Sequence, residues 1–190
     1  GIYTFGSWEA SVASRYTKRY KYSGSFNVRF SKDIIGEKGD QNYMNMNNYN
    51  VVWTHQQDPK FRPNSSFSAS VNFSSSGYSK YGSQTIGEYL NTQTNSSIAY
   101  SKSWAGTPFS LSTNFSHSQN SQDSTVSLSF PNVVFNVARI YPFRRKNASG
   151  KQRWYEKISL SYTGTLGNNV TVKERDLFTS AMFKKMKNGV

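Results

Sequence analysis

The segment Phe67–Phe73 reads FSASVNF and alternates apolar and polar residues without interruption. Its apolar positions are Phe67, Ala69, Val71 and Phe73, and every position between them is Ser or Asn. Successive side chains of a β-strand point to opposite faces, so the alternation predicts a strand between an apolar and a polar medium. The apolar medium can be a protein core or a lipid bilayer, and this choice decides what the chain does.

The same alternation recurs along the rest of the chain. It is found in residues 8–16, 22–30, 49–54, 97–104, 109–118, 126–130 and 157–166. We therefore predict an all-β fold of about eight antiparallel strands in up-and-down order, each paired with its sequence neighbour. A Greek-key crossing, or two sheets packed face to face, would contradict this prediction.

Pro131 marks one departure from the pattern. The residues that follow it, 132–141, are apolar on both faces of the predicted strand. Proline lacks the N–H that a ladder requires and is found at edges, bulges and strand starts. We expect a kink or a change of register there.

The composition excludes several classes of site. The chain has no Cys and only two His, His55 and His117, which excludes disulfides, thiolate sites and histidine-rich metal sites. His117 has no acid–base partner at the spacing of a hydrolase triad. The chain contains no run of 18 apolar residues, so no transmembrane helix is predicted. We predict that the chain is not an enzyme and has no catalytic, cofactor-binding or metal-binding residues.

The net charge of +13 indicates an anionic partner, which can be nucleic acid, an acidic polymer or lipid phosphate. The aromatic residues share strand faces with Val, Leu and Ile rather than with Lys and Arg. This pattern argues against a stacking platform for nucleic acid, so no nucleic-acid partner is predicted.

The lengths of the predicted connections favour a membrane barrel. Residues 34–48 and 75–95 form long connections, whereas 17–21, 58–63 and 105–108 are shorter. Outer-membrane barrels show this asymmetry between external loops and periplasmic turns, and Trp and Tyr cluster near the predicted strand ends as in interfacial girdles. The alternative is a soluble β-protein whose aromatic residues form an ordinary core. On the membrane interpretation, the residues expected to face lipid are Phe26, Val28, Phe67, Val71, Phe73, Leu111, Phe115 and Leu160.

Three long stretches, residues 6–40, 51–82 and 121–164, carry a family resemblance that covers most of the chain. They resemble the Bacteroidota form of the LptD family, the lipopolysaccharide-assembly proteins formerly called organic solvent tolerance proteins. The resemblance implies a periplasmic jellyroll followed by an outer-membrane barrel of about two dozen strands. It also implies a lipoprotein plug, a periplasmic protein bridge and passage of lipopolysaccharide into the outer leaflet without covalent chemistry.

The resemblance implies that residues 1–190 are one partial barrel segment, located in the outer membrane of a Gram-negative bacterium. The chain starts at Gly1 and has no jellyroll, so we expect a processed or excised piece. The implied partners are lipopolysaccharide, outer-membrane lipid, the plug lipoprotein and the bridge proteins. The alternatives are another outer-membrane transporter, either an importer or porin-like, and a soluble β-rich adhesin or lectin-like domain.

Two basic clusters are expected on the periplasmic side. They are Arg15, Lys18, Arg19 and Lys21 in the first cluster, and Arg144, Arg145 and Lys146 in the second. Their side chains can contact phosphates of lipopolysaccharide or of inner-leaflet lipid. The alternative is that they are solvated charges that keep the strand ends wet.

Overall fold

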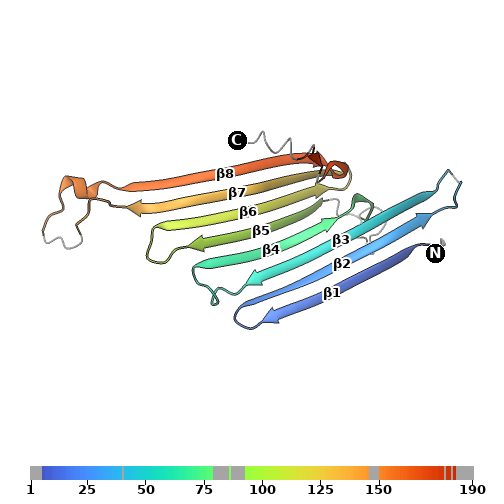
Figure 1. Ribbon diagram of the computed structural model, residues 1–190, viewed down its shortest axis with the longest axis horizontal. Helices are drawn as coiled ribbons and strands as arrows, with labels where there is room; N and C mark the ends of the chain where they lie inside the picture. The colour runs from blue at the N-terminus through green and yellow to red at the C-terminus, as the bar shows by residue number, and fades with distance from the viewer. Residues whose placement is uncertain are drawn as a thin grey trace.

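The computed structural model describes residues 6–39, 41–78, 86, 93–145, 150–177, 179–180 and 182. Eight β-strands within these residues form a single open sheet in the order β1-β2-β3-β4-β5-β6-β7-β8 (Figure 1). Every neighbouring pair of strands is antiparallel. The predicted all-β fold and up-and-down order are confirmed.

The strands are long and the helices are short. The strands are β1 (Trp8–Lys18), β2 (Tyr22–Ile35), β3 (Met44–Gln57), β4 (Ser65–Ser74), β5 (Gln93–Ser103), β6 (Phe109–Asn120), β7 (Thr125–Ile140) and β8 (Leu160–Lys173). The 3-10 helices η2 (Trp154–Lys157) and η3 (Glu174–Asp176) lie on either side of β8. No helix in the described part of the chain has the length and hydrophobicity to span a membrane.

The register sorts the side chains into two faces. Val12, Val28, Val51 and Phe73 lie directly opposite one another across β1 to β4, and they define the face that we call the apolar face. The residues on either side of them in each strand point the other way and form the polar face. The alternation in FSASVNF therefore extends across the sheet as well as along the strand.

β7 contains the change of register predicted at Pro131. Its pairing with β6 shifts between Asn114 and Ser116, and its pairing with β8 shifts between Ser129 and Asn132. An extra residue in one strand is a β-bulge, and it resets which residues point to each face. Because of this bulge, the apolar side chains before and after Pro131 stay on the same face although the alternation is broken.

β2 and β3 extend further than predicted. The sequence predicts a long connection over residues 34–48, but β2 ends at Ile35 and β3 begins at Met44. The alternation is inverted in this part of β3, because Asn47 lies on the apolar face and Met46 on the polar face. A pattern based on hydrophobicity therefore misses these residues.

The boundaries of β8 were also predicted incorrectly. The strand begins at Leu160 rather than at residue 157, because Trp154–Lys157 forms η2, and it continues to Lys173. As a result, residues 141–159 form the longest connection, while residues 121–124 form a short one. The predicted contrast between long and short connections is therefore confirmed only in part: the fourth connection, residues 75–92, is long, but the second, residues 36–43, is close in length to the third, residues 58–64.

The ladder between β4 and β5 is incomplete at one end. Its pairs run from Ser65 opposite Lys102 to Ser70 opposite Ser97 and then stop. Beyond this point, Ser96 Oγ donates to the carbonyl oxygen of Asn72 at 2.8 Å and accepts from its N–H at 2.9 Å. A side chain thus satisfies two backbone groups that a neighbouring strand would otherwise pair.

We expect Ser96→Ala to lower the free energy of unfolding by about 1–3 kcal/mol, because it leaves two backbone groups of Asn72 without this partner. The matched control is Ser97→Ala in the regular ladder, where the side chain is exposed and the change should stay within about 0.5 kcal/mol. Urea titration of the protein folded into lipid bilayers measures both effects. Equal losses in the two variants would contradict the role assigned to Ser96.

Candidate functional site

The polar face carries small hydroxyl and amide side chains across the whole sheet. One row of directly paired positions crosses all eight strands: Arg15, Ser25, Thr54, Ser70, Ser97, Ser116, Ser129 and Asn169. Hydroxyls of neighbouring strands are hydrogen bonded within this face, as between Ser25 and Thr54 at 2.9 Å and between Ser66 and Ser101 at 2.7 Å. Each hydroxyl can donate and accept, so the face offers many weak polar contacts.

The polar face is also hollowed between β4 and β8. Two open grooves have volumes of about 540 and about 410 Å³. Most residues that line them are Ser, Thr or Asn of the polar face, including Ser70 and Ser116 in the first groove and Ser101 and Ser112 in the second. The surface is therefore a mainly hydrophilic trough, and larger residues such as Arg62 and Val134 also line the second groove.

The eight residues predicted to face lipid all lie on the apolar face. The register places Phe26 opposite Trp53, and Trp53 in turn opposite Val71. Other apolar-face residues are largely exposed, with Val12 at 61% and Leu166 at 53%. Among the eight predicted residues, Leu160 is exposed and the other seven are half-buried. A partly open apolar surface of this kind indicates contact with a partner or a membrane.

A hydrogen-bonded aromatic cluster occupies the apolar face near the β1–β2 and β3–β4 connections. Trp53 Nε1 donates to Tyr16 Oη at 2.9 Å, and the same oxygen lies 2.9 Å from His55 Nδ1. The His55 ring stacks on Tyr22 and contacts Phe67, with centroids 5.5 and 5.3 Å apart. Amphipathic rings at strand ends are typical of an interfacial girdle. His55 takes part in this cluster because it lies within β3.

Gly24 makes room for this cluster. It lies directly opposite both Tyr16 and His55. A Cβ at this position would lie 2.3 Å from Tyr16 Oη and 2.5 Å from the carbonyl oxygen of Thr54. The absence of a side chain therefore lets the Tyr16 ring lean across β2 to reach β3.

The apolar face is not open over its whole length. At the end near η3, Val170, Val172 and Met182 form a buried cluster with Leu128 and Leu177 packed against it. Beside this cluster the same face carries polar residues that are also buried, namely Thr94, Ser96, His117 and Gln119. Hydrocarbon cannot satisfy polar groups, so this end of the face suits contact with protein rather than with lipid. Phe73 lies at the border, where its ring packs against His117 at 5.1 Å.

The two predicted basic clusters lie at the same end of the sheet but far apart along it. The β1–β2 and β7–β8 connections both leave the left end of the sheet in Figure 1, at its opposite sides. Arg15 and Lys18 are in β1, Arg19 and Lys21 are in the turn that follows, and Lys146 lies outside the described residues. The two basic clusters therefore lie at the same end of the sheet, but at opposite sides of it, and do not form one site.

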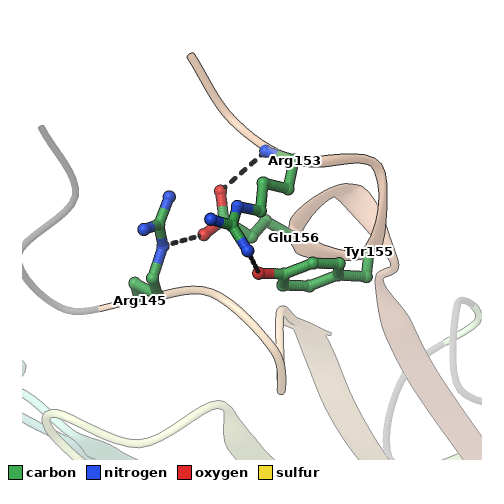
Figure 2. A network of polar contacts seen from close by, with 4 residues as sticks. All are labelled: Arg145, Arg153, Tyr155 and Glu156. Atoms are coloured by element: carbon green, nitrogen blue, oxygen red, sulfur yellow. Dashed lines mark hydrogen bonds and ion pairs between the residues drawn. The ribbon is translucent and has the colours of Figure 1, made fainter. Parts of the chain in front are cut away.

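Arg145 is held by an ion pair that the sequence analysis missed. Its Nε donates to Glu156, whose other carboxylate oxygen accepts from the N–H of Arg153 at 3.0 Å (Figure 2). The hydrogen bond from Arg145, followed by that from Arg153, lowers the pKa of the Glu156 carboxyl. The side chain of Glu156 is fully buried. The signal for this pair was that Glu156 is the only carboxylate in residues 141–159.

The chain offers little to a metal ion. Within the described ranges, no three His, Asp or Glu side chains are grouped so that they could hold one. The arrangement can therefore bind through hydrogen bonds, apolar contact and positive charge.

A single up-and-down sheet with an exposed apolar face, a hydrophilic hollow face and aromatic residues at strand ends defines a segment of a membrane β-barrel wall. The family model described as LptD protein matches residues 1–190, so the chain belongs to the LptD family. No curated protein and no solved structure matches the chain.

Membership of this family confirms the predicted function and location. The chain is a segment of the translocon that inserts lipopolysaccharide into the outer leaflet of the Gram-negative outer membrane. It is part of a transport protein and not an enzyme, and its partners are lipopolysaccharide and the other proteins of that transport system. Because the chain belongs to this family, the two alternative functions, another outer-membrane transporter and a soluble adhesin or lectin-like domain, are rejected.

The lowered pKa of Glu156 leads to a prediction about pH. A carboxyl whose pKa is lower in the folded state stabilises that state above its unfolded pKa, and the stabilisation is lost as the pH falls through the folded value. We expect the hydrogen-bonded N–H groups of Arg153, Glu156 and Ile158 to be protected from hydrogen exchange at neutral pH and to lose protection below about pH 4. The measurement is hydrogen exchange corrected for the intrinsic effect of pH.

Glu156→Gln should show the low protection at every pH, whereas the control Asp58→Asn, in the β3–β4 connection, should leave the protection of these three N–H groups as in the wild type. Wild-type protection that does not change with pH, or that survives in Glu156→Gln, would contradict the role of the ion pair.

Proposed function

We propose that the eight strands form one stretch of the LptD barrel wall, with the apolar face against membrane hydrocarbon and the polar face along the route of lipopolysaccharide. The observation that carries this proposal is the row of polar positions across all eight strands, backed by an apolar face. A glycolipid head group can move along a hydroxyl-lined trough by exchanging weak hydrogen bonds, and water can do the same.

The proposed lipid contacts are the predicted set: Phe26, Val28, Phe67, Val71, Phe73, Leu111, Phe115 and Leu160. Their common face and the exposure of its other members support this assignment. The end of the face near Val170 and Val172 is left out of the lipid-contacting surface, because it is packed against the segment that follows β8.

The sheet needs further strands if it lies in a membrane. Among the described residues, β1 and β8 each have a strand neighbour on one side. Unpaired backbone groups at a sheet edge cannot be satisfied by hydrocarbon, so a membrane sheet must close. We propose that other barrel strands continue the sheet and that a periplasmic jellyroll belongs to the same protein, as in the Bacteroidota form of the family.

We assign the specific partners by position. The plug lipoprotein contacts the polar face inside the barrel, and the periplasmic bridge proteins deliver lipopolysaccharide from the side of the basic clusters. Arg15, Lys18, Arg19, Lys21 and Arg144 are proposed to contact lipid or lipopolysaccharide phosphates. Arg145 is excluded from this role because it is paired with Glu156.

A pair of neighbouring substitutions tests the two faces. Val71→Arg places a charge in hydrocarbon and should lower the free energy of unfolding in bilayers by about 2–4 kcal/mol, with loss of protein from the outer membrane. Ser70→Arg, one residue away, enters the first groove and should leave the barrel folded. Because it obstructs the trough, it should reduce the lipopolysaccharide that reaches the cell surface.

Urea titration of the full-length protein and labelling of surface lipopolysaccharide in cells measure these effects. A Ser70→Arg variant that is as unstable as Val71→Arg, or one that is stable with unchanged surface lipopolysaccharide, would contradict the proposed function.

A further inference from the structure

The two ends of the sheet differ in charge. We call the end that carries the β1–β2, β3–β4, β5–β6 and β7–β8 connections the basic end (Figure 1). Residues 15–21 contain four Lys or Arg and no carboxylate, and residues 58–62 contain two against one. At the opposite end cations are not in excess, since residues 36–43 contain one cation and two carboxylates, residues 121–124 contain one carboxylate, and residues 173–176 contain two of each.

Cations at the basic end lie over aromatic rings. The pairs are Arg19 over Tyr20, Lys21 and Arg62 over Phe61, Lys102 over Trp104, and Arg144 over Tyr141, with distances of 4.8 to 5.9 Å to the ring centroids. Each of the four connections at this end contributes a ring. Among the described residues, these pairs are confined to the basic end, which makes them a regular feature of its edge rather than scattered contacts.

The folded turns hold these pairs in place. The ring of Phe61 is shared by Lys21 of the neighbouring connection and by Arg62 of its own. The two turns are joined by a hydrogen bond from the N–H of Asp58 to the carbonyl oxygen of Lys21, at 2.8 Å. The register of β1 to β4 therefore sets the position of the cations.

The rings remain exposed although they are large and apolar. Tyr20 is 57% exposed, and Phe61 and Trp104 are 37% and 38% exposed. Tyr20 also has a φ of 61°, in the left-handed region that a bulky residue rarely adopts and that glycine or asparagine would fill more easily. An exposed ring kept in an unfavourable backbone conformation points to a use outside the fold itself.

We propose that the basic end binds the headgroups of anionic glycerophospholipids. The rings sit at the boundary of the hydrocarbon, as aromatic residues do at membrane interfaces, and hold Lys and Arg at the depth of the lipid phosphates. The excess of cations over carboxylates selects lipids with a net negative charge over zwitterionic lipids. Lipopolysaccharide in transit meets the polar face instead. This inference rests on the proposed function, because it requires the apolar face to contact lipid.

The test uses the full-length protein in phosphatidylcholine bilayers that contain spin-labelled phosphatidylglycerol or spin-labelled phosphatidylcholine. The immobilised fraction of each probe gives its relative affinity for the protein surface. We expect the wild type to prefer phosphatidylglycerol about fivefold or more, and high salt to weaken the preference.

The variant Arg19→Gln/Lys21→Gln/Arg62→Gln should lose most of this preference. The matched control Lys32→Gln/Lys38→Gln/Lys173→Gln removes the same charge at the opposite end and should keep it. Tyr20→Gly removes one ring in a conformation that favours glycine, so it should weaken the preference without disturbing the turn.

Equal losses in the two triple variants, or no loss in the first, would overturn the inference. A first triple variant that loses binding of spin-labelled lipopolysaccharide and keeps its preference for phosphatidylglycerol would also overturn it. If neither probe is immobilised at all, the proposed function fails. If both are immobilised without selectivity, only this inference fails.

Discussion

The pairing register of the eight strands is the constraint on which the rest of the structure depends. A slip of one residue in any ladder would carry a column of serines onto the apolar face and a column of apolar residues onto the polar face. The register keeps the two faces separate across the whole sheet, along the row of paired positions that begins with Arg15 in β1 and ends with Asn169 in β8. The hydrophilic trough, the exposed apolar surface and the alignment of the four connections at the basic end follow from this register.

The structure relaxes the constraint at two kinds of place. At Pro131 the alternation is broken, and the bulge in β7 restores the separation of the faces. Near η3 the apolar face carries buried His117 and Gln119, and the ladder between β4 and β5 is completed by the Ser96 side chain. Polar groups on that face are acceptable where protein covers it. The strict alternation is therefore confined to the part of the sheet that we propose separates water from hydrocarbon.

The sequence was sufficient to predict what depends on period two. It predicted eight strands, their order, the two faces and the break at Pro131, because each follows from local alternation. It missed the start of β3, where Asn47 and Met46 invert the pattern, and the shift of β8 caused by η2. The pairing of Arg145 with Glu156 and the sharing of Phe61 by Lys21 and Arg62 depend on how connections fold against one another. No local pattern contains that information.

The most direct test of the central claim is the environment of two adjacent residues in β4. Nitroxide labels at residues 70 and 71 of the full-length protein in bilayers can be relaxed by dissolved oxygen, which concentrates in hydrocarbon, or by a water-soluble nickel complex. The account predicts that the label at residue 71 responds to oxygen and the label at residue 70 responds to nickel. If the label at residue 71 is protected from both agents, the apolar face is a protein core and the account is wrong.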